Sequence, residues 1–179
     1  MKLAQKIEVL ANVATIAAIL FLAALFIRGP FRVSSARGNG RHPGNEVHAG
    51  SSLPLSGVDW SKNGKTLLLV LNEGCHFCSE STPFYRHLSE VLASRTDVKL
   101  LAVLPQPAES AKGYLESIGV TVGEFRQASL DSLGVQGTPT LILADSKGVA
   151  TEVWLGKLNE KRESEVFDRL ACADCEKGG

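Results

Sequence analysis

Apolar residues recur along positions 53–171 in two patterns, as short continuous runs and as positions three or four apart. Short runs bounded by turn residues indicate strands, whereas the wider spacing indicates the buried face of a helix. The runs predict strands at residues 58–60, 66–71, 98–104, 139–143 and 149–155. The wider spacing predicts helices at residues 79–94, 108–118 and 160–170. This order of strands and helices predicts an α/β domain.

A separate apolar run covers residues 9–27, with only Asn12 and Thr15 as polar interruptions. As a helix it would be roughly 28 Å long, enough to cross a bilayer. A cleaved signal peptide has an apolar region of only about 7–15 residues and a cleavage site of small residues. The sequence Arg28-Gly-Pro-Phe31 is a poor cleavage site. We therefore predict an uncleaved, single-pass transmembrane helix at residues 1–28.

Residues 29–52 differ from both regions, since they are rich in Gly, Ser, Arg and Pro and have no apolar period. This composition is typical of a flexible linker. His42 and His48 lie in it, and we assign them no role. The predicted organisation is an anchor at residues 1–28, a linker at 29–52, a domain at 53–171 and a tail at 172–179.

The charge balance narrows the range of partners. The chain has 19 basic and 19 acidic residues, a formal net charge of zero, and therefore no excess of positive charge that would favour nucleic-acid binding. Its 179 residues, 44% of them hydrophobic, suffice for one anchor and one domain of ordinary size. We expect no nucleic-acid partner, no cofactor and no bound metal.

The motif Cys75-His-Phe-Cys78 carries the candidate chemistry, because it lies between an apolar strand and a predicted helix. Backbone N–H groups and the macrodipole at a helix N-terminus favour a thiolate, so Cys75 can act as a nucleophile. Cys78, one turn later, can close a reversible disulfide with it. A non-reactive buried pair and half of a zinc site are the alternatives that this motif alone leaves open.

The segment Gly137-Thr138-Pro139-Thr140 opens an apolar strand with a proline, which cannot donate to a sheet ladder. Together with the Cys75-X-X-Cys78 motif, this feature resembles the thioredoxin superfamily, whose fold is a central mixed sheet flanked by helices. The resemblance implies that Pro139 is a cis-proline beside the active-site disulfide and that Thr138 pairs with the substrate backbone. It covers roughly residues 53–170.

The added residues 121–136 and the predicted anchor make the chain most similar to the membrane-tethered TlpA and ResA type of bacterial thioredoxin-like protein. This similarity implies a thiol–disulfide oxidoreductase that reduces protein disulfides outside the cytoplasmic membrane. Cys75 would then be the nucleophile and Cys78 the resolving thiol. The implied partners are disulfide-containing proteins and a membrane electron donor or acceptor, with the domain on the periplasmic side.

The basic residues that flank the apolar run predict the opposite orientation. Lys2 and Lys6 precede the run, whereas four arginines follow it, at positions 28, 32, 37 and 41. Positive residues accumulate on the cytoplasmic side of membrane spans, so this count alone would place the domain in the cytoplasm. We give precedence to the resemblance, because exchangeable disulfides persist outside the cytoplasm.

Several positions depart from the thioredoxin pattern and leave the proton acceptor unassigned. Leu69 stands where thioredoxins have a buried acid, and His76-Phe77 replaces the usual Gly-Pro dipeptide. Glu73 or Glu80 could substitute for the acid only if one of them points toward Cys78. A cationic His76 would stabilise the Cys75 thiolate and make the pair more oxidising, whereas a solvated His76 would have little influence.

A second pair, Cys172-Ala-Asp-Cys175, lies in the tail and outside the resemblance. Three interpretations stay open: a local disulfide after the last helix, a second redox pair that relays electrons to Cys75 and Cys78, and a zinc site shared by both pairs. The shared zinc site is the weakest, because nearly a hundred residues separate the pairs, against about 15–20 in common zinc sites.

Copper delivery is the alternative function. Anchored relatives of this fold bind copper through two cysteines and a distal histidine. Here no histidine follows His87, and Met1 is the single methionine. The missing distal ligand makes metal delivery the weaker hypothesis.

Overall fold

The structure is a computed structural model of the chain, and it describes residues 46–62 and 64–171. Within these residues the strands are β1 (Lys65–Val70), β2 (Val98–Leu104), β3 (Glu124–Gln127), β4 (Thr140–Ala144) and β5 (Ala150–Leu155). The helices are α2 (His76–Glu80), α3 (Thr82–Ala93), α4 (Ala108–Ser117) and α5 (Glu160–Ala171), with short 3₁₀ turns η1 (Trp60–Lys62) and η2 (Asp131–Leu133).

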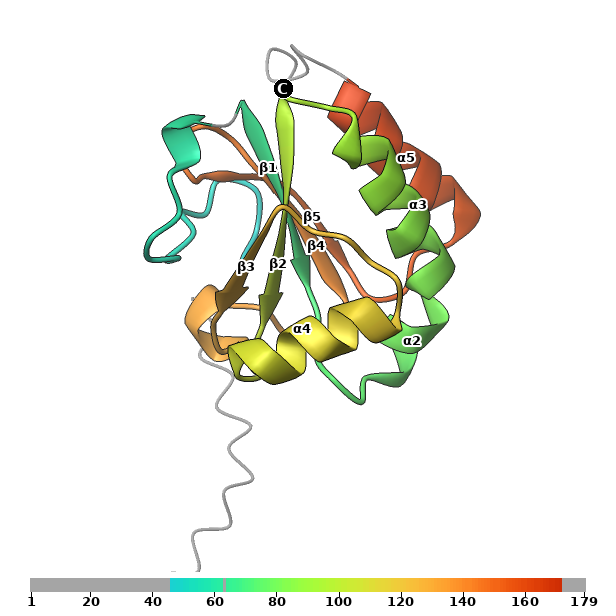
Figure 1. Cartoon of the computed structure of the whole chain (residues 1–179). Helices are drawn as coiled ribbons and strands as arrows, with labels where there is room; N and C mark the ends of the chain where they lie inside the picture. Colours follow the sequence, from blue (N-terminus) through green and yellow to red (C-terminus); the bar gives the residue numbers. More distant parts are fainter. Residues whose placement is uncertain (1–45, 63, 172–179) are drawn as a thin grey trace, which may run out of the picture. The chain divides into compact units, whose positions relative to one another are not determined.

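The five strands form one mixed sheet in the order β3-β2-β1-β4-β5 (Figure 1). Strand β1 is central and pairs in parallel with β2, which pairs in parallel with β3. Strand β4 runs antiparallel to both β1 and β5. The chain moves from β1 to β2 to β3 in one direction across the sheet, so right-handed crossovers place α3 and α4 on the same face.

Helices cover one face of the sheet. Figure 1 shows α3 and α5 side by side over this face, and an edge-to-face contact between Phe84 and Phe167 joins them. Alternate residues of the strands pack against these helices and α4 in one buried cluster, which includes Leu67, Leu69, Cys78, Leu88, Leu115, Trp154, Val166 and Leu170. Burial of these side chains is the main stabilising contribution on this side.

Irregular chain covers the other face. Leu68, Val70 and Ile142 point to this side and form a second buried cluster with Leu53 and Leu133. Both faces of β1 are therefore buried, and five of its six residues are inaccessible to solvent. Burial on both faces explains why the central strands read as continuous apolar runs in the sequence.

Most of the predicted elements agree with the structure within a few residues, and the strand at 98–104 is confirmed without a shift. The strand predicted at residues 58–60 is wrong. There the chain turns at Gly57, which has φ +76°, and enters η1, where the Asp59 side chain accepts a hydrogen bond from Ser61 and pairs with Lys62. Such local side-chain bonds compete with pairing to a strand.

The fifth strand instead comes from β3, within the residues that the sequence marks as an addition beyond the second helix. Strand β3 is a half-exposed edge strand with two charged residues in four, so it has no apolar run. A tertiary contact holds its position, since Glu124, which also pairs with Arg126 of the same strand, pairs with Lys99 of β2.

The helix predicted at residues 79–94 is two helices. It begins earlier, at His76, and is interrupted at Ser81, which has φ −87° and ψ 1°. Pro83 has no N–H, so it cannot donate to the carbonyl of Ser79 and continue the first helix. The Ser81 hydroxyl donates to the carbonyl of Phe77 at 2.9 Å, which closes the last turn of α2.

Residues 46–52, part of the predicted linker, pack onto the domain. Val47 N–H donates to the carbonyl of Gly134 at 2.9 Å, and Gly50 N–H donates to that of Ala150 at 2.7 Å. The predicted membrane-spanning run at residues 9–27 lies outside the described residues. Among the helices that the structure does describe, none combines the length and the apolar composition that a bilayer crossing requires.

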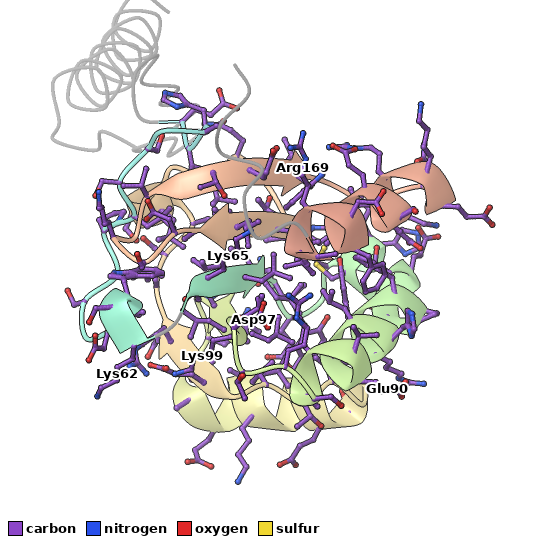
Figure 2. All side chains as sticks on the ribbon, turned by 90° about the horizontal axis from the view of Figure 1, so that it is seen from above. Lys62, Lys65, Glu90, Asp97, Lys99 and Arg169 are labelled. Atoms are coloured by element: carbon purple, nitrogen blue, oxygen red, sulfur yellow. The ribbon has the colours of Figure 1, made fainter. Side chains whose placement is uncertain are left out.

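The end of the sheet where β1 and β2 begin carries paired charges. Figure 2 views the molecule from above, with Lys65 and Asp97 close together and Arg169 nearby on α5. Arg95 pairs with Asp97, and its guanidinium also donates to the carbonyl of Leu170 at 2.8 Å. This bond ties the last turn of α5 to the start of β2.

Candidate active site

Cys75 lies at the opposite end of the sheet, where β1 ends and α2 begins. It is the N-cap of α2, and its Sγ accepts a hydrogen bond from the N–H of Cys78 at 3.2 Å. The chain reaches this position through a turn in which Cys75 N–H donates to the carbonyl of Asn72 at 3.1 Å. Gly74 in this turn has φ +78°, a conformation that residues with a Cβ rarely adopt. The predicted strand-to-helix junction is confirmed.

Cys75 is half-buried and has a thiol pKa below its usual value. Partial burial acts most strongly and raises the pKa, but hydrogen bonds involving Cys78, the Thr138 side chain and the backbone of Phe77 together outweigh it. Hydrogen bonds to sulfur stabilise the thiolate more than the thiol. Cys75 is therefore the cysteine of the pair that reaches solvent and ionises more easily.

Cys78 has the opposite environment, since its side chain is inaccessible to solvent within the core. Burial, the largest cause, and the interaction with Cys75 together raise the pKa of Cys78 to about 12, against a hydrogen bond from the Asn72 backbone that lowers it. The two thiols are both free in the structure. Their difference in exposure and proton affinity is the pattern of an attacking thiol and a resolving thiol.

Thr138 and Pro139 meet the cysteines although more than sixty residues separate them in the chain, and the Cys75 thiol donates to the carbonyl of Thr138 at 3.3 Å. The Thr138–Pro139 peptide bond is cis, as the resemblance implies. Pro139 is buried, and its carbonyl accepts from Gly156 N–H at 2.7 Å. The segment therefore lies directly against the attacking sulfur, and the role of Thr138 in pairing with a substrate stays a prediction.

His76 and Phe77 point away from the sulfur atoms. The His76 side chain is 78% exposed, and its Nε2 lies 3.3 Å from Glu80, which also pairs with Lys157 at 3.2 Å. Phe77 is 54% exposed and its ring contacts that of His76. The structure thus places the His76 imidazole beside Glu80, and His76 is not among the main influences on the Cys75 pKa.

Among the described residues, no carboxylate is buried in the core that contains the Cys78 thiol. Leu69 is fully buried in the same cluster as Cys78, at the position where thioredoxins have an acid. Glu73 and Glu80 are both exposed. The groups beside the pair are instead neutral: Asn72 and Gln106, whose side chains bond to each other, and the tyrosines Tyr85 and Tyr114. These neutral groups could not be identified from the sequence, because their partners lie on other elements.

Cys172 and Cys175 lie outside the described residues, so their three interpretations stay open. The described chain ends at Ala171, beside the Leu170 carbonyl that Arg95 binds, at the end of the sheet opposite Cys75. Within residues 46–62 and 64–171, no three or more His, Cys, Asp or Glu side chains gather in a way that could hold a metal ion.

Comparison with known proteins gives similarity in structure alone. No family model matches the chain, and no curated protein matches it in sequence. Among solved structures, the thioredoxin domain of a thiol-disulfide oxidoreductase from Bacteroides vulgatus matches with a TM-score of 0.55 and 18% identity, over 71% of this chain and 100% of that one. A thiol:disulfide interchange protein from Bacteroides sp. matches with a TM-score of 0.52 and 18% identity, over 72% and 91%.

A thiol-disulfide isomerase from Corynebacterium glutamicum gives a TM-score of 0.52 with 16% identity, over 70% of this chain and 93% of that one. Identities this low establish the fold and leave the activity to the site itself. The chain has the thioredoxin-like fold, and its Cys75 and Cys78 pair lies at the junction of the central strand β1 and α2.

Proposed function

We propose that this protein is a membrane-anchored thiol–disulfide oxidoreductase that reduces protein disulfides outside the cytoplasmic membrane. One observation carries the proposal: Cys75, at the N-cap of α2, is half-buried and has a lowered pKa. Its sulfur accepts a hydrogen bond from the N–H of the buried Cys78 and lies against the carbonyl of Thr138. This arrangement separates an accessible nucleophile from a protected resolving thiol. A structural cysteine pair has no need of that separation.

The exchange proceeds in two balanced steps. The Cys75 thiolate attacks one sulfur of the substrate disulfide, forming a mixed disulfide and releasing the other substrate sulfur as a thiolate. The Cys78 thiolate then attacks Cys75 Sγ, closes the Cys75–Cys78 disulfide and releases the second substrate thiolate. Two electrons pass to the substrate, and each released thiolate takes up a proton. A dithiol donor must reduce the protein again.

The electrostatics of Cys75 support the reducing direction. A dithiol becomes more oxidising when its thiolate is strongly stabilised, because that stabilisation favours the reduced form. Cys75 receives its stabilisation from hydrogen bonds, against the opposing effect of burial. No cationic side chain is among the main influences on its pKa, and the His76 imidazole pairs with Glu80. Modest stabilisation of this kind supports a potential nearer to that of thioredoxin than to that of DsbA.

The membrane location rests on the sequence. The apolar run at residues 9–27 has the length of a transmembrane helix, and a donor in the same membrane would be within reach of a tethered domain. Labelling of intact cells with a thiol reagent that does not cross membranes tests the orientation. Labelling of Cys75 before lysis is expected, and protection of every cysteine until lysis would contradict the external location.

The function is tested with the detergent-solubilised full chain carrying Cys172→Ser and Cys175→Ser, assayed for reduction of insulin disulfides by dithiothreitol. We expect turnover in this parent, its loss in Cys75→Ser, and a trapped mixed disulfide in Cys78→Ser. Equal turnover in parent and Cys75→Ser would overturn the proposal. Stoichiometric copper retained by the reduced parent, with no turnover, would favour metal delivery instead.

A further inference from the structure

Two buried side-chain atoms among the described residues have no hydrogen-bond partner, Gln106 Oε1 and the hydroxyl of Tyr114. Buried polar atoms are nearly always hydrogen-bonded, so an unpartnered one calls for a reason. Gln106 still bonds through its Nε2 to Asn72. The Tyr114 hydroxyl has no such second bond, and it is inaccessible although the residue as a whole is only partly buried.

Tyr114 belongs to α4 and packs against the core cluster that contains Cys78. Burial raises the pKa of Tyr114 to about 12, and the next largest influences are the charges of Cys78 and then Cys75. An ionised Cys78 would therefore act on this hydroxyl, ahead of Cys75 and the carboxylate of Glu73. The hydroxyl remains protonated at neutral pH, so it can donate a hydrogen bond and cannot act as a base.

The resolving step requires stabilisation of the Cys78 thiolate, which a hydrogen-bond donor such as the Tyr114 hydroxyl can supply. Cys78 must be a thiolate to attack Cys75, yet its burial opposes ionisation. Leu69 leaves no buried carboxylate in the core beside it, and Glu73 and Glu80 are exposed. When Cys78 ionises, its sulfur becomes a much stronger acceptor, and a nearby unengaged donor gains a charge-assisted bond.

We propose that the Tyr114 hydroxyl donates a hydrogen bond to the Cys78 thiolate during the resolving step, in place of the buried acid that Leu69 excludes. This inference rests on the proposed function. Tyr114 takes no proton and gives none up. The Cys78 proton leaves to solvent, the S–S bond between Cys75 and the substrate breaks, the Cys75–Cys78 bond forms, and the departing substrate thiolate is protonated by solvent.

Tyr85 provides a matched control. It is buried in α3 within the same cluster, and it too is influenced by the charges of Cys78 and Cys75. Its hydroxyl differs in being already engaged with the Ser81 side chain. Tyr85→Phe removes the same atom from the same core, but from a hydroxyl that already has Ser81 as a hydrogen-bonding neighbour.

The experiment follows reaction of the reduced full chain, with Cys172→Ser and Cys175→Ser, with the aromatic disulfide DTNB by stopped flow. Attack by Cys75 releases the first coloured thiolate, and attack by Cys78 releases the second, so two phases report the two steps. For Tyr114→Phe we expect an unchanged first phase, a second phase slowed about 10-fold at pH 7, and a pH profile of that phase moved to higher pH. Tyr85→Phe should leave the second phase unchanged.

An unaltered second phase in Tyr114→Phe would overturn the inference, as would equal slowing of both phases or equal slowing in Tyr85→Phe. Replacement of Tyr114 by 3-fluorotyrosine tests the same bond without loss of packing. A more acidic hydroxyl is a stronger donor, so the second phase should accelerate, and an unchanged rate would count against the donor role. Absence of the first phase in the parent protein would instead be a failure of the proposed function.

Discussion

The two ends of the sheet differ in the interactions of their polar side chains. At the end where β1 and β2 begin, charged side chains pair across elements, with Arg95 joining Asp97 to the carbonyl of Leu170. At the other end, Cys75 accepts a hydrogen bond from the Cys78 N–H and donates one to the Thr138 carbonyl, and His76 lies beside Glu80 at the surface. In Figure 1, α2 lies at the lower end of the sheet and the last turn of α5 at its upper end.

The difference indicates how one small domain keeps stability and reactivity apart. A charge close to the thiols would fix their ionisation and hence their redox potential. Hydrogen bonds and burial instead give each cysteine its own proton affinity. Ion pairs at the far end can hold the elements together without changing the pKa values of the two thiols.

The largest expected effect concerns the contrast between the two thiols themselves. With its pKa raised to about 12, Cys78 is a thiolate in only about one molecule in 10⁵ at pH 7. Because the pKa of Cys75 is below its usual value, its thiolate fraction at pH 7 is more than about 10³-fold larger than that of Cys78. Iodoacetamide at pH 7 should therefore modify Cys75 alone, as mass spectrometry of the Cys172→Ser/Cys175→Ser protein can show. Comparable modification of Cys78 would remove the assignment of roles.

The next effect is a loss of stability at alkaline pH. The pKa of Cys78 is higher in the folded state than in the unfolded state. The neutral thiol therefore contributes its full stabilisation of the fold below about pH 8.5, and this stabilisation is lost as the pH rises toward 12. Between pH 8 and pH 10, the reduced protein should lose about 2 kcal/mol more than Cys78→Ala, measured by urea unfolding. The lowered pKa of Cys75 acts in the opposite direction, and Cys78→Ala removes part of that lowering, because one of its causes is the hydrogen bond with the Cys78 side chain. Equal pH dependence of the two proteins would contradict the buried-thiol account.

Substitution at the far end should affect stability alone. Arg95→Met keeps much of the side-chain volume but removes the bond to Leu170, which should lower the free energy of unfolding by about 1 kcal/mol. Alkylation of Cys75 should keep its rate and its pH dependence. A changed thiol pKa in this variant would show that the two ends are coupled.

The smallest expected effect is at His76. His76→Ala should leave the pKa of Cys75 unchanged, because the imidazole is exposed and paired with Glu80. Thr138→Val is the matched positive control, since it removes a hydrogen-bonding group that lowers the Cys75 pKa, and the pKa should rise. The pH dependence of Cys75 alkylation measures both, and a marked rise in His76→Ala would restore His76 as a modulator of the site.

Local patterns sufficed for the elements that are buried on both faces. Strand β2 was predictable to the residue because continuous burial demands a continuous apolar run. Strand β3 was not, because an edge strand with charged residues is selected by its neighbours, here through Lys99 and Glu124. The break between α2 and α3 depends on Pro83, whose position early in α3 becomes evident only once the start of α2 is known.

For the site, the sequence by itself determined the chemistry available: two thiols at exchange spacing after a buried strand, a proline at the start of a later strand, and a leucine at the position of the usual acid. Only the tertiary structure decided which thiol is exposed, brought Thr138 to Cys75, turned His76 toward Glu80 and left the Tyr114 hydroxyl buried and unpartnered. Residue identity fixes what a side chain can donate, accept or lose, whereas burial and neighbours from distant elements fix how strongly it does so.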